Sequence, residues 1–385
     1  MSKTDHVVII GAGVAGLAAA VSLDMAGVRA TVYEGRCDNT DTGISFVIRE
    51  SGLRVLGDIG VLDAVRKHSF PMPKRFFTPG CPGYTENDWA DYGTGNRSIS
   101  REDLLGILRA EVRHRAIEVC HGKRLHSLQQ HPESVVASFA DGTRAESDLL
   151  IGADGRSSVT RGCIFPSVRL QHARAWCVYG HSGIDDLDPA SRTALEEGAG
   201  LVMFDAELGF LAYRDDPQLP RKVTWMLFGG TERKIPTKSF ELVDREMLMR
   251  ELEDGLRKHS PVAADIVAAT LRVAPTQVFT LPALPAWSAG RVALIGDAAH
   301  PVDPIIGAGT AFALEDAIYV AKMLREHHYL DAFYYLHADR HHRVDEMIAR
   351  SAAGLEASMR LATFEIGWDL PDEVTPAELV PAPNR

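Results

Sequence analysis

Apolar and polar positions follow two different patterns along the chain. In residues 1–70 and 98–165, short apolar runs alternate with segments whose apolar residues recur at helical spacing. This pattern predicts alternating strands and helices. From about Ala173 to Leu281 the pattern is strand-rich, with one amphipathic helix predicted at Asp244–His259. The first pattern resumes at Gly290, and a long helical region follows. The predicted strands are His6–Ile10, Ala30–Tyr33, Val135–Phe139, Ala145–Ile151, Ala175–Tyr179, Gly200–Phe204, Gly209–Tyr213, Val223–Phe228 and Val292–Ile295.

A glycine-rich turn follows the first predicted strand. Gly11, Gly13 and Gly16 form a Gly-x-Gly-x-x-Gly pattern that continues into an alanine-rich helix, Leu17–Met25. Glycines at these positions permit a tight turn, let a pyrophosphate approach the backbone and let helix and strand pack closely. The next strand ends at Glu34, whose carboxylate can accept hydrogen bonds from both hydroxyls of a ribose. The arrangement predicts a dinucleotide site.

A second site for a polar ligand is predicted nearly three hundred residues later. Gly296 breaks the strand Val292–Ile295, and Asp297 presents a carboxylate where the strand ends. Gly307 and Gly309 then open a long helical pattern, whose N-terminus favours negative charge. One ligand held by both glycine-rich segments would bring the two ends of the chain into one domain.

A third segment, Ser147–Arg161, contains a strand that ends in Gly-x-Asp-Gly. Together the three segments resemble the class A flavoprotein monooxygenases, the aromatic hydroxylases of the p-hydroxybenzoate hydroxylase type. The resemblance extends to an Arg-x-x-Leu segment at Arg101–Leu104, to Gly43–Ile44 with the predicted helix Leu53–Leu56, and to the C-terminal stretch Tyr335–Arg350. It covers most of the chain apart from its middle.

The resemblance implies non-covalently bound FAD, with NAD(P)H as a co-substrate. In that family the first motif holds the ADP half of FAD, and the Gly296–Asp297 motif contacts the ribityl chain and pyrophosphate region. The Asp154–Gly155 motif is associated with both FAD and NAD(P)H. Because FAD occupies the Gly-x-Gly-x-x-Gly pattern, we expect NAD(P)H to bind transiently near Asp154–Gly155. The implied cofactor-binding residues are Gly11, Gly13, Ala15, Gly16, Glu34, Gly35, Arg36, Gly43, Arg101, Leu125, Asp154, Gly155, Gly296, Asp297, Pro304, Gly307, Ala308 and Gly309.

The fold implied by the resemblance is α/β. It has a Rossmann-like FAD-binding domain (ββα, glutathione-reductase-type), an inserted mixed-sheet substrate domain, and C-terminal helices. We expect the FAD-binding domain to comprise residues 1–70, 98–172 and 281–385. The substrate-binding domain would then comprise residues 71–97 and 173–280, including a polar loop rich in proline and glycine, Pro71–Gly95.

The implied activity is insertion of one oxygen atom from O2, through a flavin C4a-hydroperoxide, into an aromatic or polycyclic small molecule. We predict no particular catalytic residue, because a deprotonated phenolic or amino substrate supplies its own activation. The alternative is a flavin reductase or dehydrogenase of the same fold that inserts no oxygen. A flavin halogenase is less favoured because its Trp-x-Trp-x-Ile-Pro motif is absent. A non-enzymatic nucleotide-binding module is least favoured.

Two positions depart from the family pattern. Family members usually carry Gly-Gln-Gly where this chain has Gly307–Ala308–Gly309, so a glutamine side-chain contact is lost while the glycine amides remain. Asp303 is an uncommon acid for its loop. It has two interpretations: a turn residue that caps the coming helix, or a substrate contact.

The substrate site is less well specified. Arg49 and Arg54 are candidates to pair with an acidic or phenolate group near the flavin, or they are exposed helix residues. Aromatic residues of the strand-rich middle are candidate pocket walls or ordinary core. They are Phe210, Tyr213, Trp225 and Phe228.

Composition excludes some partners and compartments. A net charge of −11 argues against a nucleic-acid partner, which would require a basic face. No apolar run approaches the roughly 20 residues that span a bilayer, and no cleavable signal pattern is present. Five scattered cysteines without a Cys-x-x-Cys pair suggest reduced thiols. We therefore expect a cytoplasmic enzyme without membrane association.

No metal site is predicted. His337 and His341 have the i, i+4 spacing of two ligands on one helix face, but no cysteine or carboxylate set completes a recognisable site. The chain also ends without the extra C-terminal domain that some larger hydroxylases carry. We therefore expect a monomer or a weak dimer.

Overall fold

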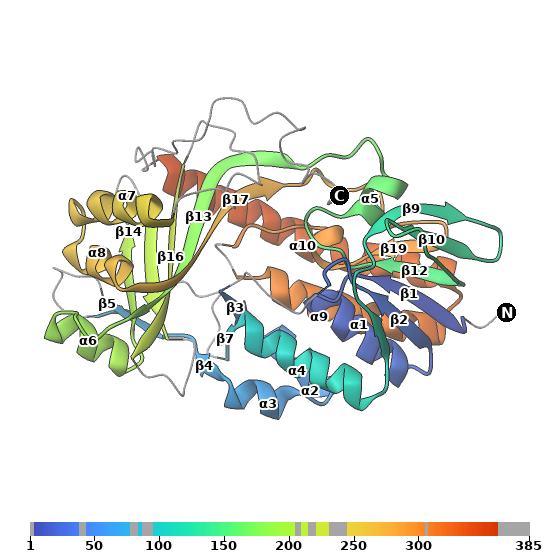
Figure 1. The fold of residues 1–385 in the computed structure, drawn as a ribbon, viewed down its shortest axis with the longest axis horizontal. Helices are drawn as coiled ribbons and strands as arrows, with labels where there is room; N and C mark the ends of the chain where they lie inside the picture. Colours follow the sequence, from blue (N-terminus) through green and yellow to red (C-terminus); the bar gives the residue numbers. More distant parts are fainter. Residues whose placement is uncertain are drawn as a thin grey trace, which may run out of the picture.

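A six-stranded sheet brings together strands from the beginning, the middle and the end of the chain (Figure 1). The computed structural model describes residues 4–37, 44–77, 84–86, 95–204, 209–214, 221–230, 245–304 and 307–360. Strand β1 pairs in parallel with both β2 and β12, and β12 pairs in parallel with β19. In sheet order the strands are β18 (Ser288–Ala289), β19 (Val292–Leu294), β12 (Leu149–Gly152), β1 (His6–Ile10), β2 (Arg29–Tyr33) and β8 (Glu118–Cys120).

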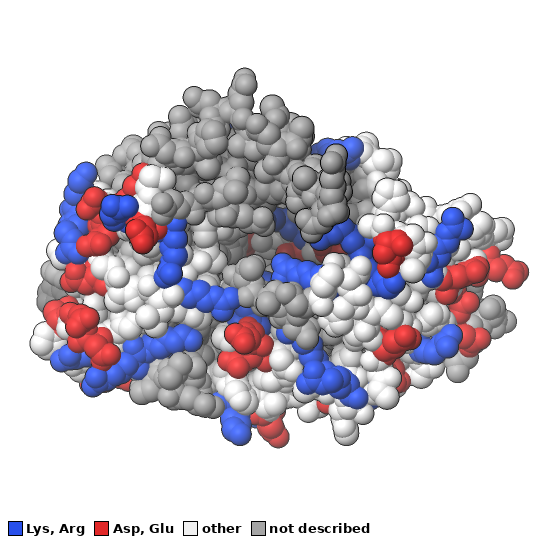
Figure 2. Space-filling model, viewed as in Figure 1, with Lys and Arg blue, Asp and Glu red and all other residues white. Residues whose placement is uncertain are grey.

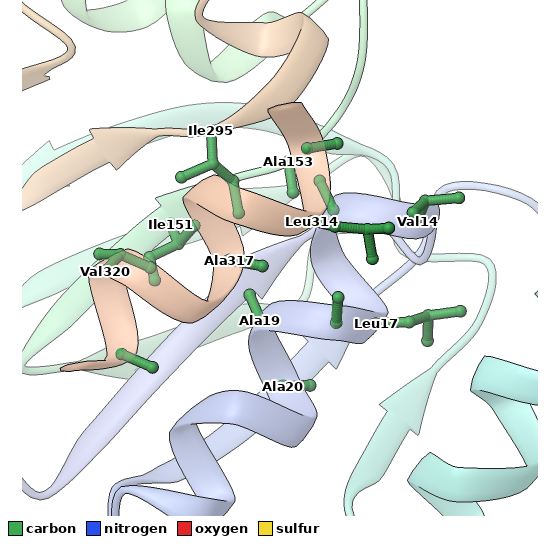
Figure 3. Close-up of a cluster of buried hydrophobic side chains, with 14 of the residues drawn as sticks. Val14, Leu17, Ala19, Ala20, Ile151, Ala153, Ile295, Leu314, Ala317 and Val320 are labelled. Carbon is green, nitrogen blue, oxygen red and sulfur yellow. The ribbon is translucent and has the colours of Figure 1, made fainter. Parts of the chain in front are cut away.

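Helices α1 (Val14–Met25) and α9 (Gly309–Glu326) pack against each other and against this sheet. Every residue of α1 from Val14 to Leu23 is buried, which explains why the helix is alanine-rich instead of amphipathic. Figure 3 shows Ala19 of α1 beside Ala317 of α9, with Ile151 of β12 behind α9. Small side chains let the two helices approach closely, so this core joins the two ends of the chain.

A seven-stranded sheet forms the other large layer, on the left of Figure 1. Helices α7 (Arg245–Arg257) and α8 (Pro261–Ala268) cover one face of this sheet. On that face Trp176, Phe210 and Trp225 form a buried cluster with leucine and alanine side chains of the two helices. In sheet order the strands are β17 (Thr270–Thr280), β13 (Gln171–Gly183), β16 (Lys222–Gly230), β15 (Gly209–Tyr213), β14 (Gly200–Phe204), β5 (Arg75–Phe77) and β6 (Tyr84–Glu86).

Two smaller antiparallel sheets and several helices complete the described structure. Helix α10 (Tyr329–Arg360) contacts both β18 and β16, and therefore touches both large sheets. One small sheet contains β9 (Leu125–Gln130), β10 (Val135–Phe139) and β11 (Arg144–Ser147), and the other β3 (Ser45–Ile48), β7 (Arg97–Ser100) and β4 (Ser69–Pro71). The remaining helices are α2 (Glu50–Asp58), α3 (Leu62–Lys67), α4 (Arg101–His114), α5 (Val159–Ile164), α6 (Pro189–Glu196) and α10 (Tyr329–Arg360).

The predicted strand Ala145–Ile151 is wrong as a single element. It divides at Asp148 into β11, which pairs antiparallel with β10, and β12, which joins the parallel sheet. The Asp148 carboxylate accepts hydrogen bonds from the backbone N–H groups of Asp5 and His6, at 2.8 and 2.9 Å. This contact with a segment far away in the sequence fixes the point at which the chain changes sheets.

Helix α8 and strand β17 were not predicted, because their apolar residues follow neither period clearly. Within Pro71–Gly95, predicted as a loop, β5 pairs with β14 and extends the seven-stranded sheet. The structure describes helix Asp244–His259 from Arg245 onward, as α7. No helix among the described ranges combines the length and apolar character needed to cross a bilayer.

Candidate functional site

The turn between β1 and α1 has the geometry that the glycine pattern predicts. Gly11 has a φ of +105°, which disfavours any residue with a side chain. A Cβ at Gly16 would lie 1.9 Å from the Gly11 carbonyl oxygen, so only glycine permits this approach of helix to turn. A Cβ at Gly13 would meet nothing within 4 Å, and Gly13 lines a cavity. The first and third glycines thus shape the turn, while the second leaves its backbone open to a ligand.

Glu34 lies at the end of β2 beside this turn. Its carboxylate accepts hydrogen bonds from the backbone N–H groups of Ala12 and Arg36, both at 2.8 Å. These bonds hold the acid against the glycine-rich turn and leave lone pairs for a ligand hydroxyl. Arg36, two residues further on, lines the cavity.

In the Gly-x-Asp-Gly segment, the Asp154 carboxylate binds residues that follow it closely in the chain. Asp154 accepts hydrogen bonds from the Ser158 hydroxyl at 2.6 Å and from the Thr160 backbone N–H at 2.9 Å, and so stabilises the start of α5. Gly155, with a φ of +74°, carries the backbone to the cavity wall. Arg161 donates to the Ala298 carbonyl oxygen at 2.9 Å and thereby ties this segment to the Asp297 motif.

Asp297 lines the cavity from the short 3-10 turn Gly296–Ala298. The side chain is exposed to the open cavity. Although the side chain opens onto the cavity, protein atoms packed around it desolvate the carboxylate and raise the pKa of Asp297, and the nearby charges of His300, Arg101 and Arg156 oppose that rise. The Asp297 carboxylate is partly shielded from water by the protein, so it is well suited to accept hydrogen bonds from a ligand.

A buried charge network supports the Asp297 turn from behind. Asp316 of α9 accepts hydrogen bonds from the Gly296 backbone N–H at 2.9 Å, from His300 Nε2 at 2.6 Å and from Arg340 Nε at 2.5 Å. Arg340 also donates to Glu315 at 2.9 Å. Asp316 is 0 % exposed. Although burial raises its pKa, the charges of His300 and Arg340 and these hydrogen bonds lower it to about 2.

The first turn of α9 faces the cavity. Gly307, Gly309 and Thr310 line it, and a Cβ at Gly309 would lie 3.8 Å from Asp297 Oδ1. The N-terminal N–H groups of an 18-residue helix are therefore directed toward the same space as the Asp297 carboxylate. Ala308 is fully buried and has no side-chain hydrogen-bonding group, so it contributes to the turn only through its backbone.

One cavity of about 520 Å³ joins these motifs to the seven-stranded sheet. Its volume is in the range of ordinary small-molecule sites. Arg36, Arg101 and Arg156 line it, and the sheet contributes Tyr179 and Tyr213 with neighbouring apolar side chains. Figure 2 shows basic side chains at the border of a hollow in the middle of the face that is turned to the viewer. The cavity combines groups suited to a phosphate-containing ligand with an apolar, aromatic wall.

The sequence comparison identifies the family. A family model described as "FAD binding domain" matches residues 4–350. The chain belongs to this FAD-binding family. The 6-hydroxynicotinate 3-monooxygenase of Pseudomonas fluorescens is 27% identical, over 90% of each chain. The kynurenine 3-monooxygenase of Salinispora tropica is 29% identical, over 84% of this chain and 74% of that protein. The expected relationship to the class A flavoprotein monooxygenases is confirmed.

Solved structures show the same fold. The 2,6-dihydroxypyridine-3-hydroxylase of Arthrobacter nicotinovorans aligns with a TM-score of 0.81 and 21% identity, over 96% of each chain. Klebsiella pneumoniae HpxO, complexed with FAD and uric acid, aligns with a TM-score of 0.79 and 21% identity, over 92% of this chain and 88% of that one. The predicted α/β class therefore holds for this FAD-binding protein.

The cavity brings together half of the cofactor-binding residues that the sequence predicts. Gly43 lies outside the described residues. Leu125 is packed in the apolar core between the β9–β10–β11 sheet and the six-stranded sheet, and Gly296 is buried behind Asp297. Those that line the cavity are Gly13, Ala15, Arg36, Arg101, Gly155, Asp297, Pro304, Gly307 and Gly309. Those that do not are Gly11, Gly16, Glu34, Gly35, Leu125, Asp154, Gly296 and Ala308.

Two of the four aromatic candidates for the substrate wall lie on the wrong face of the sheet. Phe210 and Trp225 are fully buried against α7 and α8, with ring centroids 6.2 Å apart. Phe228 lies on the cavity side but is covered by its neighbours, while Tyr213 lines the cavity. Side chains alternate across a strand, so Phe210 and Tyr213 necessarily occupy opposite faces.

Several cavity residues were not predicted. Leu211 and Met226 alternate with Phe210 and Trp225 and would have followed from choosing the other face of each strand. Tyr179 lies at the predicted end of a strand that continues to Gly183. Arg156 directly follows Gly155, and its guanidinium donates to the Gln277 carbonyl oxygen at 3.1 Å. Its position directly after the motif is the sequence feature from which a role for Arg156 in the cavity could have been predicted.

The remaining candidates lie apart from the cavity lining. Arg49 precedes α2, and Arg54 is exposed on that helix. The rings of His337 and His341 stack at 4.6 Å on α10, and His341 Nδ1 lies 2.9 Å from the His337 carbonyl oxygen. Within the described part of the chain, no group of three or more histidine, cysteine or acidic residues is arranged to hold a metal ion.

Proposed function

We propose that this protein is a single-component, NAD(P)H-dependent FAD monooxygenase that inserts one oxygen atom from O2 into an aromatic or polycyclic small molecule. The observation that carries the proposal is a cavity that the glycine-rich motifs and the seven-stranded sheet line together. A redox cofactor held by the motifs would face a substrate held by the sheet. The class A relatives are named as monooxygenases of ring compounds, which agrees with this arrangement.

The residues present fit FAD. Gly13 leaves open space beside the backbone, and Arg36 and Arg101 supply positive charge for a pyrophosphate. Asp297 would accept hydrogen bonds from the ribityl hydroxyls, and Glu34 from the adenosine ribose. When bound, FAD supplies the redox chemistry that activates dioxygen with electrons from NAD(P)H. The N-terminal N–H groups of α9 suit negative charge at the N1–C2=O edge of a flavin.

The proposed domain division assigns one of the two large sheets to each domain, with boundaries that fall inside β4 and near the start of β13. Residues 1–70, 98–172 and 281–385 would form the FAD-binding domain, with the Rossmann-like, glutathione-reductase-type arrangement. Residues 71–97 and 173–280 would form the inserted substrate domain. The pairing of β5 with β14 supports the assignment of the first of these segments to the substrate domain.

We propose that the substrate is a flat ring compound. The relatives' names mention 6-hydroxynicotinate, kynurenine and urate, each of which contains a ring. In this chain Tyr179 and Tyr213 offer aromatic surface, and Leu211 and Met226 fill the wall between them. Burial raises the pKa of Tyr179 well above its ordinary value, so its hydroxyl stays protonated and positions a ligand by hydrogen bonding.

Two measurements test the proposal. Acid precipitation of purified protein should release yellow FAD to the supernatant, and a protein that cannot be reconstituted with FAD would overturn the assignment. Turnover with NAD(P)H and ring compounds should then yield products that have gained one oxygen atom by mass. Consumption of NAD(P)H that produces only hydrogen peroxide or reduced product, over a broad panel, would favour the alternative reductase or dehydrogenase.

A further inference from the structure

Arg156 lines the cavity where the cofactor motifs meet the seven-stranded sheet. It directly follows the Asp154–Gly155 motif, and its side chain reaches strand β17. There Nη1 donates hydrogen bonds to the Gln277 carbonyl oxygen at 3.1 Å and to the Thr276 hydroxyl oxygen at 3.4 Å. The guanidinium carbon lies 5.0 Å from the centre of the Phe279 ring. These contacts fix the guanidinium against this strand of the sheet.

Two nitrogens of the Arg156 guanidinium are left for a ligand. Nη1 donates both hydrogen bonds, whereas Nε and Nη2 donate none within the described ranges. Both Nε and Nη2 remain open to solvent. Asp297 and Asp303 line the same cavity, but in the described part of the chain neither forms an ion pair with Arg156. The N–H groups of Nε and Nη2 are therefore available inside the cavity.

Arg161, in the same segment, has a different environment. Its Nη1 donates to the Ala298 carbonyl oxygen at 2.9 Å, and its Nη2 donates to the Arg156 carbonyl oxygen at 2.7 Å. The residue is only 4% exposed. Backbone carbonyl oxygens thus bind both Nη groups of Arg161, which has a structural role. Arg156 is half-buried and belongs to the cavity wall, so packing alone does not account for its open donors.

The position of Arg156 strengthens its attraction for an anion. Burial lowers the pKa of Arg156, and the nearby Asp297 and Tyr179 oppose this effect. An arginine nevertheless stays cationic at neutral pH, because its ordinary pKa lies far above that range. Water only partly solvates a half-buried cation, so an anionic ligand gains more there than at an open surface. Nε and Nη2 lie side by side on the planar guanidinium and match the two oxygens of a carboxylate.

We propose that Arg156 is a specificity-determining residue whose Nε and Nη2 bind a carboxylate on the substrate ring. The inference rests on the proposed function, and it narrows the substrate class to aromatic or polycyclic acids. The ring would then lie toward Tyr179, which lines the cavity on the neighbouring strand β13. A neutral carboxamide of the same shape presents one acceptor oxygen and no charge, so it would bind more weakly.

The test measures ligand binding to the FAD-loaded protein by isothermal titration calorimetry. The ligands are naphthoate and quinoline carboxylate, each paired with its carboxamide, and pentafluorophenolate, an anion with a single oxygen. Arg156→Gln removes the charge, and Arg156→Lys keeps the charge but not the two parallel donors. Arg144→Gln, a change at an exposed arginine of β11 outside the cavity lining, is the matched control. FAD affinity, the urea unfolding midpoint and the KM for NAD(P)H are measured for every variant.

We expect the wild type to bind each carboxylate about tenfold to a hundredfold more tightly than its carboxamide, the effect of a charge-assisted hydrogen bond. Arg156→Gln should abolish that preference and leave carboxamide binding unchanged. Arg156→Lys should weaken binding of the carboxylates but not of pentafluorophenolate, because an ammonium does not offer two parallel donors. Arg144→Gln should behave as the wild type does.

A wild type that does not prefer the carboxylates, or an Arg156→Gln variant that keeps the preference, would overturn the proposal. A lower FAD affinity or a higher KM for NAD(P)H in Arg156→Gln would also overturn it, by placing the cation in the site of a cofactor or co-substrate. If Arg156→Gln does not fold, Arg156→Lys decides, and unchanged carboxylate binding there would refute the two-atom contact. These binding results stand apart from turnover, whose failure to yield oxygenated product would count against the proposed function alone.

Discussion

Replacing Asp316 by asparagine would remove the negative charge at the centre of the network behind the Asp297 turn. Asp316 is fully buried and accepts three hydrogen bonds, from Gly296, His300 and Arg340. Breaking a buried ion pair on one side typically costs about 3–5 kcal/mol, because the partner charge stays buried. Glu315 accepts a hydrogen bond from Arg340 at 2.9 Å and is retained in the variant, so we expect a loss near 3 kcal/mol in the free energy of unfolding.

The pKa of Asp316 gives an independent measure. A fall from the ordinary value of 3.8 to about 2 corresponds to roughly 2–3 kcal/mol of stabilisation at neutral pH. Because the folded-state pKa is lowered, this stabilisation is fully present above pH 3.8 and is lost as the pH falls toward 2. The variant should therefore show a flatter dependence of stability on pH across this acidic window than the wild type.

The same substitution should weaken FAD binding, and a matched control separates this effect from general destabilisation. Glu315→Gln removes the neighbouring acid, which contacts Arg340 and Arg343 but not the Gly296 turn. Urea denaturation of the apoprotein should show a loss for both variants. Titration of FAD by fluorescence quenching should show affinity reduced about tenfold only for Asp316→Asn, as expected for one lost hydrogen bond to a charged group. Equal FAD affinity in the two variants would refute the role of Asp316 in positioning the turn.

Three further substitutions test other parts of the site. Asp297→Ala should lower FAD affinity by very roughly tenfold to a hundredfold. The apoprotein should not be destabilised, because desolvation already disfavours the charge of Asp297. Unchanged affinity in a FAD titration would mean that the motif is misassigned. Gly16→Ala should cost about 1–3 kcal/mol in urea denaturation, because its Cβ would lie 1.9 Å from the Gly11 oxygen. A fully stable variant would contradict that geometry. Trp225→Ala should lower the free energy of unfolding by about 3–5 kcal/mol. Dissociation constants for ring compounds should not change at a temperature where the variant is folded. Weaker binding of ring compounds would instead indicate that Trp225 belongs to the substrate wall.

The local sequence determines the elements that hold the cofactor motifs. Gly11, Gly16 and the strand before them specify one turn, because the steric requirements of that turn involve residues close together in the chain. The same holds for Gly296 and Asp297, where an apolar run ends in a glycine with a φ of +57°. Such motifs have few alternative conformations, so their type and position could be predicted.

Only the tertiary structure decided which face of the seven-stranded sheet lines the cavity. Strands β15 and β16 are apolar on both faces, so their alternation does not distinguish Phe210 and Trp225 from Leu211 and Met226. The choice depends on helices α7 and α8, which cover one face from elsewhere in the chain. The pairing of Asp316 with Arg340 is likewise set by the packing of α9 against α10. A local pattern specifies what a segment can form, whereas the identity of its neighbours depends on the packing of the whole chain.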